Sequence, residues 1–453
     1  MATARLDPRR AGWLLPALDA FLQARDEAEA LAAVRAVQAE DPDATRLTLA
    51  TRLAVRRLSA LSLRPGLVIL RPALREALLA RGADPAALEA LGLLAAEWEV
   101  LADIALLYDN RSGRSERALE LLTVMALGLG ELELARELDQ AHLQAQVEPV
   151  DAGPLARRLE KALAREGRLV PASLLVGLGA TWLEARATAS LAALWFEQAA
   201  VEEEGVRVLL ELSRREKEEL FQVLVEVAWA DGQVAPEERR LIEQRLSLAR
   251  LDEAGRRRVR ERLDARPVAA AAPGRLDRSA RRFVLEQAIL LTLVDEEQHP
   301  DELQALQGIA RRLGGSAHEL EETLVEVAAF CEQHRALLQS FGPVSGALGR
   351  LQRLVRERAQ EAVKKNAGAL LTEVKETGEL ARLLAAASVR RLTRDETRRV
   401  QQQLLDVART IPALAIFALP GGALLLPILI KVLPWRVLPS AFADDAEPGS
   451  PLA

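Results

Sequence analysis

The chain has few aromatic residues, histidines and cysteines. Aromatic residues make up 3% of its 453 residues, and Cys331 is its one cysteine. A single cysteine cannot close a disulfide within the chain, which indicates a reducing compartment. So few rings cannot provide the stacking platforms typical of proteins that bind single-stranded nucleic acid. The net charge of −6 argues against DNA as a partner, although local basic clusters are compatible with it.

Motifs of common catalytic sites are also missing. The four histidines are not arranged as HExxH, and no glycine-rich phosphate loop or GxSxG nucleophile elbow occurs. The sequence therefore predicts that the protein is not an enzyme.

Ala, Leu, Arg and Glu dominate, and half of the residues are hydrophobic. These are strong helix formers, whereas the aromatic residues that favour strands are scarce. We therefore expect an all-α, multi-domain fold. The expected domains are an N-terminal helical region (1–205), a second helical domain (206–342), an amphipathic helical connector (343–389) and a C-terminal segment with an acidic tail (390–453).

An apolar run over residues 411–435 contains one charged residue, Lys431. Its uncharged part is about 20 residues long, which is enough for a helix to cross a bilayer. Proline recurs through the run, at Pro412, Pro420, Pro427 and Pro434. Because proline interrupts helices, we expect a kinked span or a re-entrant hairpin, with a buried hairpin in a soluble protein as the alternative.

Residues 390–442 contain a pattern of prolines and aromatic residues around one lysine: Pro412, Phe417, Pro420, Pro427, Lys431, Pro434, Pro439 and Phe442. This pattern resembles the LETM family of leucine-zipper/EF-hand transmembrane proteins and their bacterial relatives. The resemblance implies a membrane segment and, in the family, a following domain that binds ribosomes. Membrane lipid and the ribosome are thus the implied partners.

Two departures from the family pattern matter. Ala423 occupies a position where the family carries an acidic residue, which argues against ion exchange. The sequence ends at Ala453, eleven residues after Phe442, and this leaves no room for a long domain after the motif. We therefore do not expect such a domain to bind ribosomes directly.

Arginines outnumber acids before the apolar run: Arg390, Arg391, Arg394, Arg398, Arg399 and Arg409 against Asp395, Glu396 and Asp406. By the positive-inside rule, this side of the run should be cytoplasmic. We expect a membrane-associated protein with most of the chain in the cytoplasm. The alternative is a wholly cytoplasmic protein.

Residues 206–342 contain a repeat offset by 64 positions. Asp231 precedes Glu238 by seven residues, and Asp295 precedes Glu302 by seven. The block resembles the TerB family of tellurite-resistance-associated proteins, and that resemblance implies a divalent cation bound by these four carboxylates. The alternative is that Asp231 ends a helix before a positive-φ Gly232, while Glu238 and Glu302 stabilise helix N-termini.

Two apolar helical stretches, 104–130 and 169–199, lie within residues 100–200. They resemble the paired helices of EcsC-like proteins, a family of membrane-associated bacterial helical proteins. The apolar stretch 170–183 stops at Glu184 and Arg186, so it is too short to span a bilayer. We expect it to be a core helix or an interfacial one, and an ordinary helical bundle is the alternative.

Two functional hypotheses follow. The first is a membrane-associated, non-enzymatic scaffold or sensor related to LETM proteins, with the ribosome as its partner. The second is a soluble, TerB-like protein of a stress response that binds a divalent cation. The sequence predicts no oligomeric state.

Overall fold

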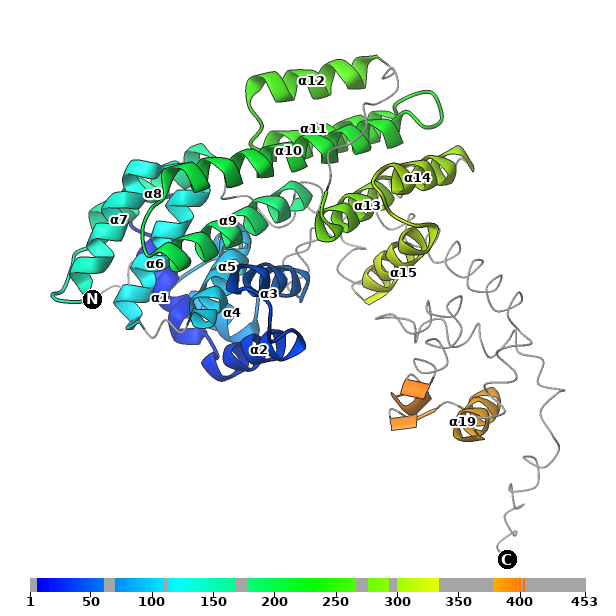
Figure 1. Ribbon diagram of the computed structural model, residues 1–453, viewed down its shortest axis with the longest axis horizontal. Helices are drawn as coiled ribbons and strands as arrows, with labels where there is room; N and C mark the ends of the chain where they lie inside the picture. Colours follow the sequence, from blue (N-terminus) through cyan, green and yellow to red (C-terminus); the bar gives the residue numbers. More distant parts are fainter. Residues whose placement is uncertain are drawn as a thin grey trace, which may run out of the picture. The chain divides into compact units, whose positions relative to one another are not determined.

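The computed structural model describes residues 6–60, 70–108, 112–167, 169, 178–265, 276–292, 300–333 and 378–390, together with 392–393, 395–396, 398–400 and 402–403. These residues form helices, turns and loops, and none of them is in a strand (Figure 1). The predicted all-α fold is confirmed.

The chain divides into two compact units, residues 1–291 and 292–453. The division falls inside the range 206–342 that was predicted as one domain. The helices of the first unit are α1 (Leu14–Ala24), α2 (Glu27–Glu40), α3 (Arg46–Ala60), α4 (Pro72–Ala80), α5 (Pro85–Leu107), α6 (Arg114–Gly128), α7 (Leu132–Ala145), α8 (Gly153–Arg165), α9 (Leu178–Gln198), α10 (Glu203–Ala228), α11 (Pro236–Leu248), α12 (Glu253–Asp264) and α13 (Arg278–Thr292), which ends at the division. In the second unit, α14 (Pro300–Arg312) contacts α15 (Ala317–Gln333), and α19 spans Gly378–Val389.

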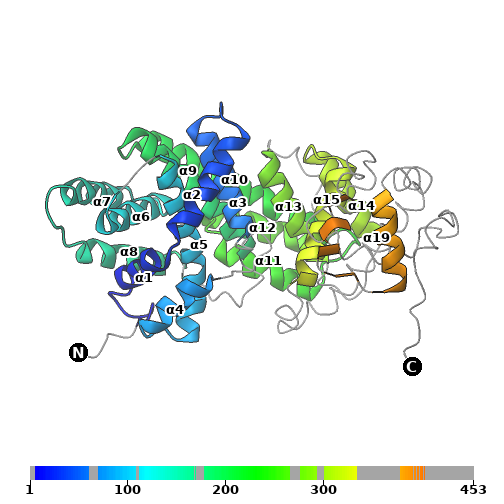
Figure 2. The ribbon, with the colours of Figure 1, turned by 90° about the horizontal axis from the view of Figure 1, so that it is seen from below.

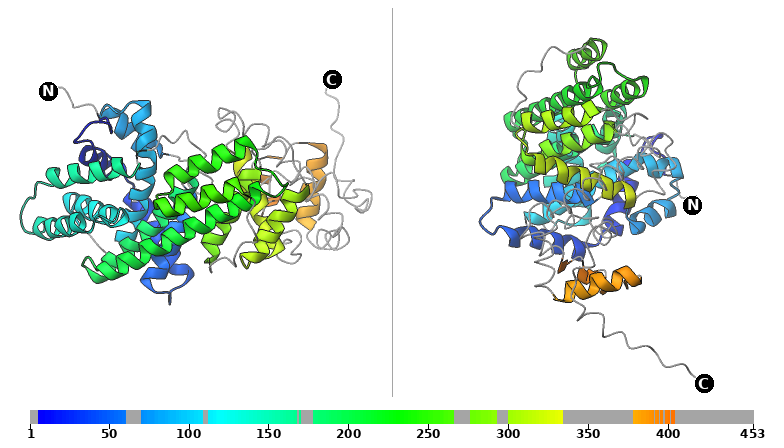
Figure 3. Two further views of the ribbon diagram at one scale, coloured as in Figure 1. Left: turned by 90° about the horizontal axis from the view of Figure 1, so that it is seen from above. Right: turned by 90° about the vertical axis from the view of Figure 1, so that its right-hand side faces the viewer.

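Helices α5 and α9 form the centre of the first unit. Helix α5 contacts α2, α3, α6 and α9, whereas α9 also contacts α3, α6, α10 and α11. Almost every residue of α5 after Leu91 is buried, which is typical of a helix that is apolar on all sides. Figure 2 shows α6 and α7 packed side by side. Helix α10 contacts both α11 and α12, which are among the green helices of Figure 3.

Cap residues explain where several of these helices begin. The Asp26 carboxylate accepts hydrogen bonds from the amides of Ala28 and Glu29, both at 3.0 Å, at the start of α2. Asp84 accepts one from the Ala87 amide at 2.8 Å, and Pro85 follows it as the first residue of α5. Both patterns satisfy amides that a helix leaves unpaired at its N-terminus.

One arginine joins the ends of three helices. Arg250 has a positive φ of 52° and follows the end of α11. Its guanidinium donates to the carbonyls of Gly128 (3.2 Å) and Leu129 (3.4 Å), where α6 ends. It also donates to Glu166 at 3.1 Å, where α8 ends. These contacts supply donors to carbonyls that the end of α6 leaves without an intrahelical partner.

Helix α9 continues through the two charged residues at which the apolar stretch 170–183 stops. Glu184 and Arg186 are both buried within it. Residues 178–183 of the stretch are helical, and Trp182 and Leu183 are buried, which favours the core helix over the interfacial one. No described helix has the length and apolar character needed to cross a membrane. The apolar run 411–435 lies outside the described residues.

Candidate functional site

The predicted metal ligand Asp231 lies in the turn after α10. Its Oδ1 accepts a hydrogen bond from the Gln233 amide at 3.0 Å. Gly232 has a φ of 96°, a conformation that glycine adopts readily. These contacts are the ones expected of a helix-terminating turn.

Glu238 also makes a hydrogen bond to a residue close to it in the sequence. It is buried in the first turn of α11, and its Oε2 accepts a hydrogen bond from the Ala235 amide at 3.0 Å. For this copy of the repeat, the contacts favour the helix-capping alternative over metal ligation.

The second copy is described only in part. Asp295 lies outside the described residues. Glu302 lies in the first turn of α14, as predicted, but its side chain is not described. Among the described residues, no three His, Cys, Asp or Glu side chains gather where they could hold a metal ion. The four-carboxylate cation site stays a prediction.

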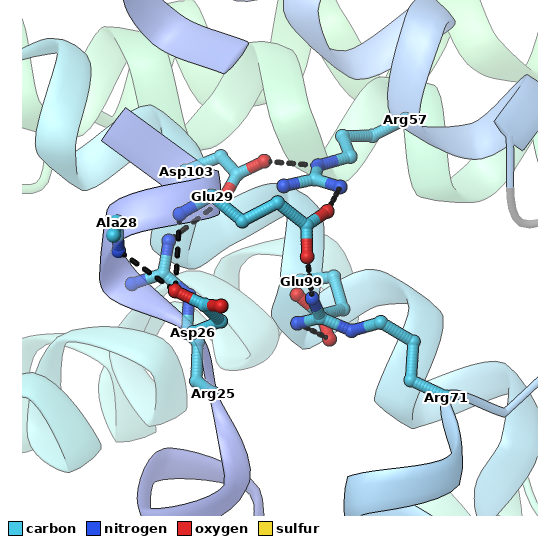
Figure 4. Close-up of polar contacts among 8 residues, drawn as sticks. All are labelled: Arg25, Asp26, Ala28, Glu29, Arg57, Arg71, Glu99 and Asp103. Carbon is cyan, nitrogen blue, oxygen red and sulfur yellow. Dashed lines mark hydrogen bonds and ion pairs between the residues drawn. The ribbon is translucent and has the colours of Figure 1, made fainter. Parts of the chain in front are cut away.

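The structure brings together a charged cluster that was not predicted. It joins three arginines and three carboxylates, which we call the arginine–carboxylate cluster: Arg25, Arg57, Arg71, Glu29, Glu99 and Asp103 (Figure 4). Arg25 follows α1, Arg57 lies on α3 and Arg71 precedes α4, whereas Glu29 lies on α2. Glu99 and Asp103 are one turn apart on α5, so they share one face of that helix.

Asp103 is the most buried member, with a fully inaccessible side chain. Its two oxygens accept hydrogen bonds from Arg25 Nη2 at 2.7 Å and from Arg57 Nε at 2.5 Å. Arg57 also donates to Glu29 at 3.0 Å. The cluster therefore links α1, α2 and α3 to the central helix α5.

Arg71 completes the cluster by bridging Glu29, at 2.9 Å, and Glu99. Burial raises the pKa of the Glu99 carboxyl, against the opposing effect of Arg71. By contrast, the hydrogen bond from Arg57 lowers the pKa of the more exposed Glu29. Three positive and three negative groups balance here, and each acid is paired with an arginine. The arrangement is suited to joining helices.

A second buried pairing joins α9 to α10. Arg186 is ion-paired with Glu216, and Lys217 lies 2.9 Å from Glu184. All four side chains are at most 8% exposed. The acids and bases that end the apolar stretch in the sequence are thus satisfied by neighbouring residues of α10.

The C-terminal part of the second unit contains a helical pair, which we call the α19 hairpin: α19 and the helical residues among 395–403 (Figure 1). Its second helix starts with a capping box. The Glu396 carboxylate accepts from the Thr393 amide at 2.8 Å, and the Thr393 hydroxyl accepts from the Glu396 amide at 3.3 Å. Arg390 donates to both oxygens of Glu396, at 2.8 and 2.6 Å. This hydrogen bonding lowers the pKa of Glu396 to about 2.

Glu379 at the start of α19 holds the other end of the hairpin. Its carboxylate accepts from Gln403 at 2.6 Å and lies 3.5 Å from Arg399. Val400 is fully buried, whereas Arg398 is exposed and has no ion pair among the described residues. The predicted motif residues Pro412, Phe417, Pro420, Pro427, Lys431, Pro434, Pro439 and Phe442 lie outside the described residues.

Comparison with known families identifies the segment that begins in this hairpin. Residues 392–449 match a family model described as "LETM1-like, RBD", a ribosome-binding domain. No curated protein and no solved structure matches the chain. The TerB-like and EcsC-like resemblances stay predictions. The resemblance placed the family's ribosome-binding domain after the membrane motif, and we did not expect such a domain here; the match to the ribosome-binding model instead spans the apolar run itself. The predicted similarity to the LETM family is confirmed for residues 392–449 of this chain.

Proposed function

We propose that this chain is a non-enzymatic scaffold that binds ribosomes through residues 392–449. The match of this segment to the LETM1-like ribosome-binding domain carries the proposal. The described start of the segment supports it, because a capped helix there presents arginines to solvent. Surplus arginine is what contacts with the phosphates of RNA require.

The same segment contains the apolar run 411–435, which we propose as a membrane anchor. If the run occupies the bilayer, residues 392–410 form the polar stretch beside it. That stretch contains four of the arginines that predict a cytoplasmic location: Arg394, Arg398, Arg399 and Arg409. Ribosome binding and membrane attachment would then use adjacent parts of one segment.

Ribosome binding is tested by sedimentation of the full-length protein with purified bacterial ribosomes through a sucrose cushion. We expect the intact chain to pellet with ribosomes and a chain truncated before residue 392 to stay above the cushion. The truncation retains the whole first unit, so circular dichroism can verify that its helices are intact. Equal pelleting of both chains would contradict the assignment to residues 392–449.

Membrane attachment is tested by carbonate extraction of membranes from cells that express the intact chain or a version truncated before Arg409. We expect the intact chain to stay in the pellet and the truncated chain to be released, because about 20 apolar residues anchor firmly. Release of the intact chain would show that the run is not an integral anchor. Ribosome sedimentation would still decide the first part of the proposal.

A further inference from the structure

We propose that Arg382 and Arg398 bind phosphate groups of ribosomal RNA, and that Glu379 weakens a third such contact by Arg399. This inference rests on the proposed ribosome binding, and it names the chemistry of the partner and a restraint on it. The inference is based on the ion pairs of the α19 hairpin, which involve some of its arginines and leave others without a carboxylate partner among the described residues.

The second helix of the hairpin has one exposed face and one buried face. The exposed residues are Asp395, Arg398, Arg399 and Gln402, at the i, i+3, i+4 and i+7 positions of a helix. Val400 is fully buried, and Glu396 and Gln403 are half-buried. The two arginines therefore lie on the side of this helix that faces solvent.

Ion pairs divide the described arginines of the hairpin into two groups. Arg390 is held by Glu396, and Arg399 is held by Glu379. Arg382 and Arg398 are exposed and have no ion pair among the described residues. Arg382 is one turn after Glu379 on α19, and Arg398 directly precedes Arg399. The charges of Arg382 and Arg398, which no carboxylate compensates among the described residues, are thus close in sequence to the Glu379–Arg399 ion pair. Two such positive charges can bind the phosphates of a nucleic acid.

Glu379 affects binding in two ways. Its carboxylate occupies Arg399, and its negative charge repels a phosphate that approaches the same place. The ion pair is long, at 3.5 Å, and both side chains are exposed, by 58% for Arg399 and 41% for Glu379. Such pairs contribute little stability, so a phosphate can replace the carboxylate at small cost. Glu379 therefore weakens, without preventing, a third contact.

The test measures the affinity of the full-length protein for purified ribosomes at several salt concentrations. For R382Q/R398Q we expect roughly tenfold weaker binding, and a slope of log affinity against log salt that is smaller by about 1.4 to 1.8. The matched control is R35Q, because Arg35 is exposed on α2 and has no described ion pair. Its affinity and its slope should equal those of the unmodified protein.

A double-mutant cycle tests the restraint by Glu379. We expect E379Q to bind about threefold more tightly and R399Q to change little, because Glu379 already occupies that arginine. In E379Q/R399Q most of the gain should disappear, because the contact of Arg399 with phosphate is lost and only the relief of charge repulsion is left. E76Q removes from α4 an exposed carboxylate that has no ion pair within the part of the chain that the structure describes, and it controls for overall charge. A gain of the same size in E76Q, or a gain that survives undiminished in E379Q/R399Q, would overturn the restraint.

The outcomes separate this inference from the function on which it rests. If the unmodified protein does not bind ribosomes, both fail. If it binds and R382Q/R398Q binds equally well at every salt concentration, only the RNA contact is overturned.

The same variants are tested on phosphatidylglycerol vesicles. A loss of vesicle binding with unchanged ribosome binding would assign the arginines to lipid and would also overturn the inference. The glutamines replace exposed side chains, and circular dichroism verifies the fold.

Discussion

Asp103→Ala is expected to destabilise the first unit by about 3–5 kcal/mol. The substitution leaves Arg25 and Arg57 close to the core without the carboxylate that both now contact. Their side chains are 4% and 13% exposed, so water cannot replace that partner fully. The free energy of unfolding is measured by urea denaturation of the full chain, followed by far-ultraviolet circular dichroism.

Two comparison variants separate the cost of leaving buried arginines without a partner from the cost of losing a carboxylate in general. Asp26→Ala removes an exposed N-cap aspartate and should cost about 1 kcal/mol. Arg25→Met/Arg57→Met/Asp103→Leu removes the buried charges together and should recover much of the stability that Asp103→Ala loses. A triple variant no more stable than Asp103→Ala would show that the cluster contributes specific hydrogen bonds beyond charge balance.

Trp98→Ala should cost about 3–5 kcal/mol, because it removes the largest fully buried side chain of the central helix α5. The indole packs against Phe21, with ring centroids 5.7 Å apart, and its Nε1 donates to the Met125 sulfur at 3.1 Å. The neighbouring side chains cannot close a cavity of this size fully. The same urea denaturation measures the effect.

Trp229→Ala is the matched control, because the same atoms are removed from a half-exposed position near the end of α10. It should cost clearly less, and part of that cost is the hydrogen bond from Nε1 to the Arg262 carbonyl at 3.0 Å. Equal losses in the two variants would contradict burial as the origin of the effect at Trp98.

Sequence patterns that act locally predicted much of the fold. Helix formers and scarce aromatic residues indicated an all-α protein, and the structure confirms it. Pro236 and Pro300 begin α11 and α14, at the first helical position, where a proline is well tolerated. The turn at Gly232 has the positive φ that one of the two alternatives required. Each of these features depends on residues within a few positions of one another.

The buried charges could not be predicted in the same way. Glu184 and Arg186 looked like the end of an apolar stretch, because their partners Lys217 and Glu216 lie about 30 residues further along the chain. The cluster around Asp103 likewise depends on arginines 46 and 78 positions away. One signal was available: acids one turn apart, at Glu99 and Asp103, within a stretch of α5 whose other residues after Leu91 are apolar except for Glu97. Such acids need partners from elsewhere in the chain.

The part of the candidate site that could be predicted from the sequence is the segment with the LETM pattern. The LETM resemblance located the segment that the family model matches at residues 392–449. The pairing of Arg399 with Glu379 and of Arg390 with Glu396 could not be read from composition, because it depends on how two short helices meet. These pairings decide which arginines have uncompensated charge.

The contacts of Arg250 have a consequence for how the first unit loses structure. This side chain, just past α11, satisfies carbonyls at the end of α6, 121 and 122 positions earlier in the chain. Fraying of either helix end breaks the same hydrogen bonds, so neither end can open without cost to the other. Segments that share such bonds open together as one cooperative unit. The ends of α6 and α11 therefore belong to a single unit of local unfolding, although more than a hundred residues separate them.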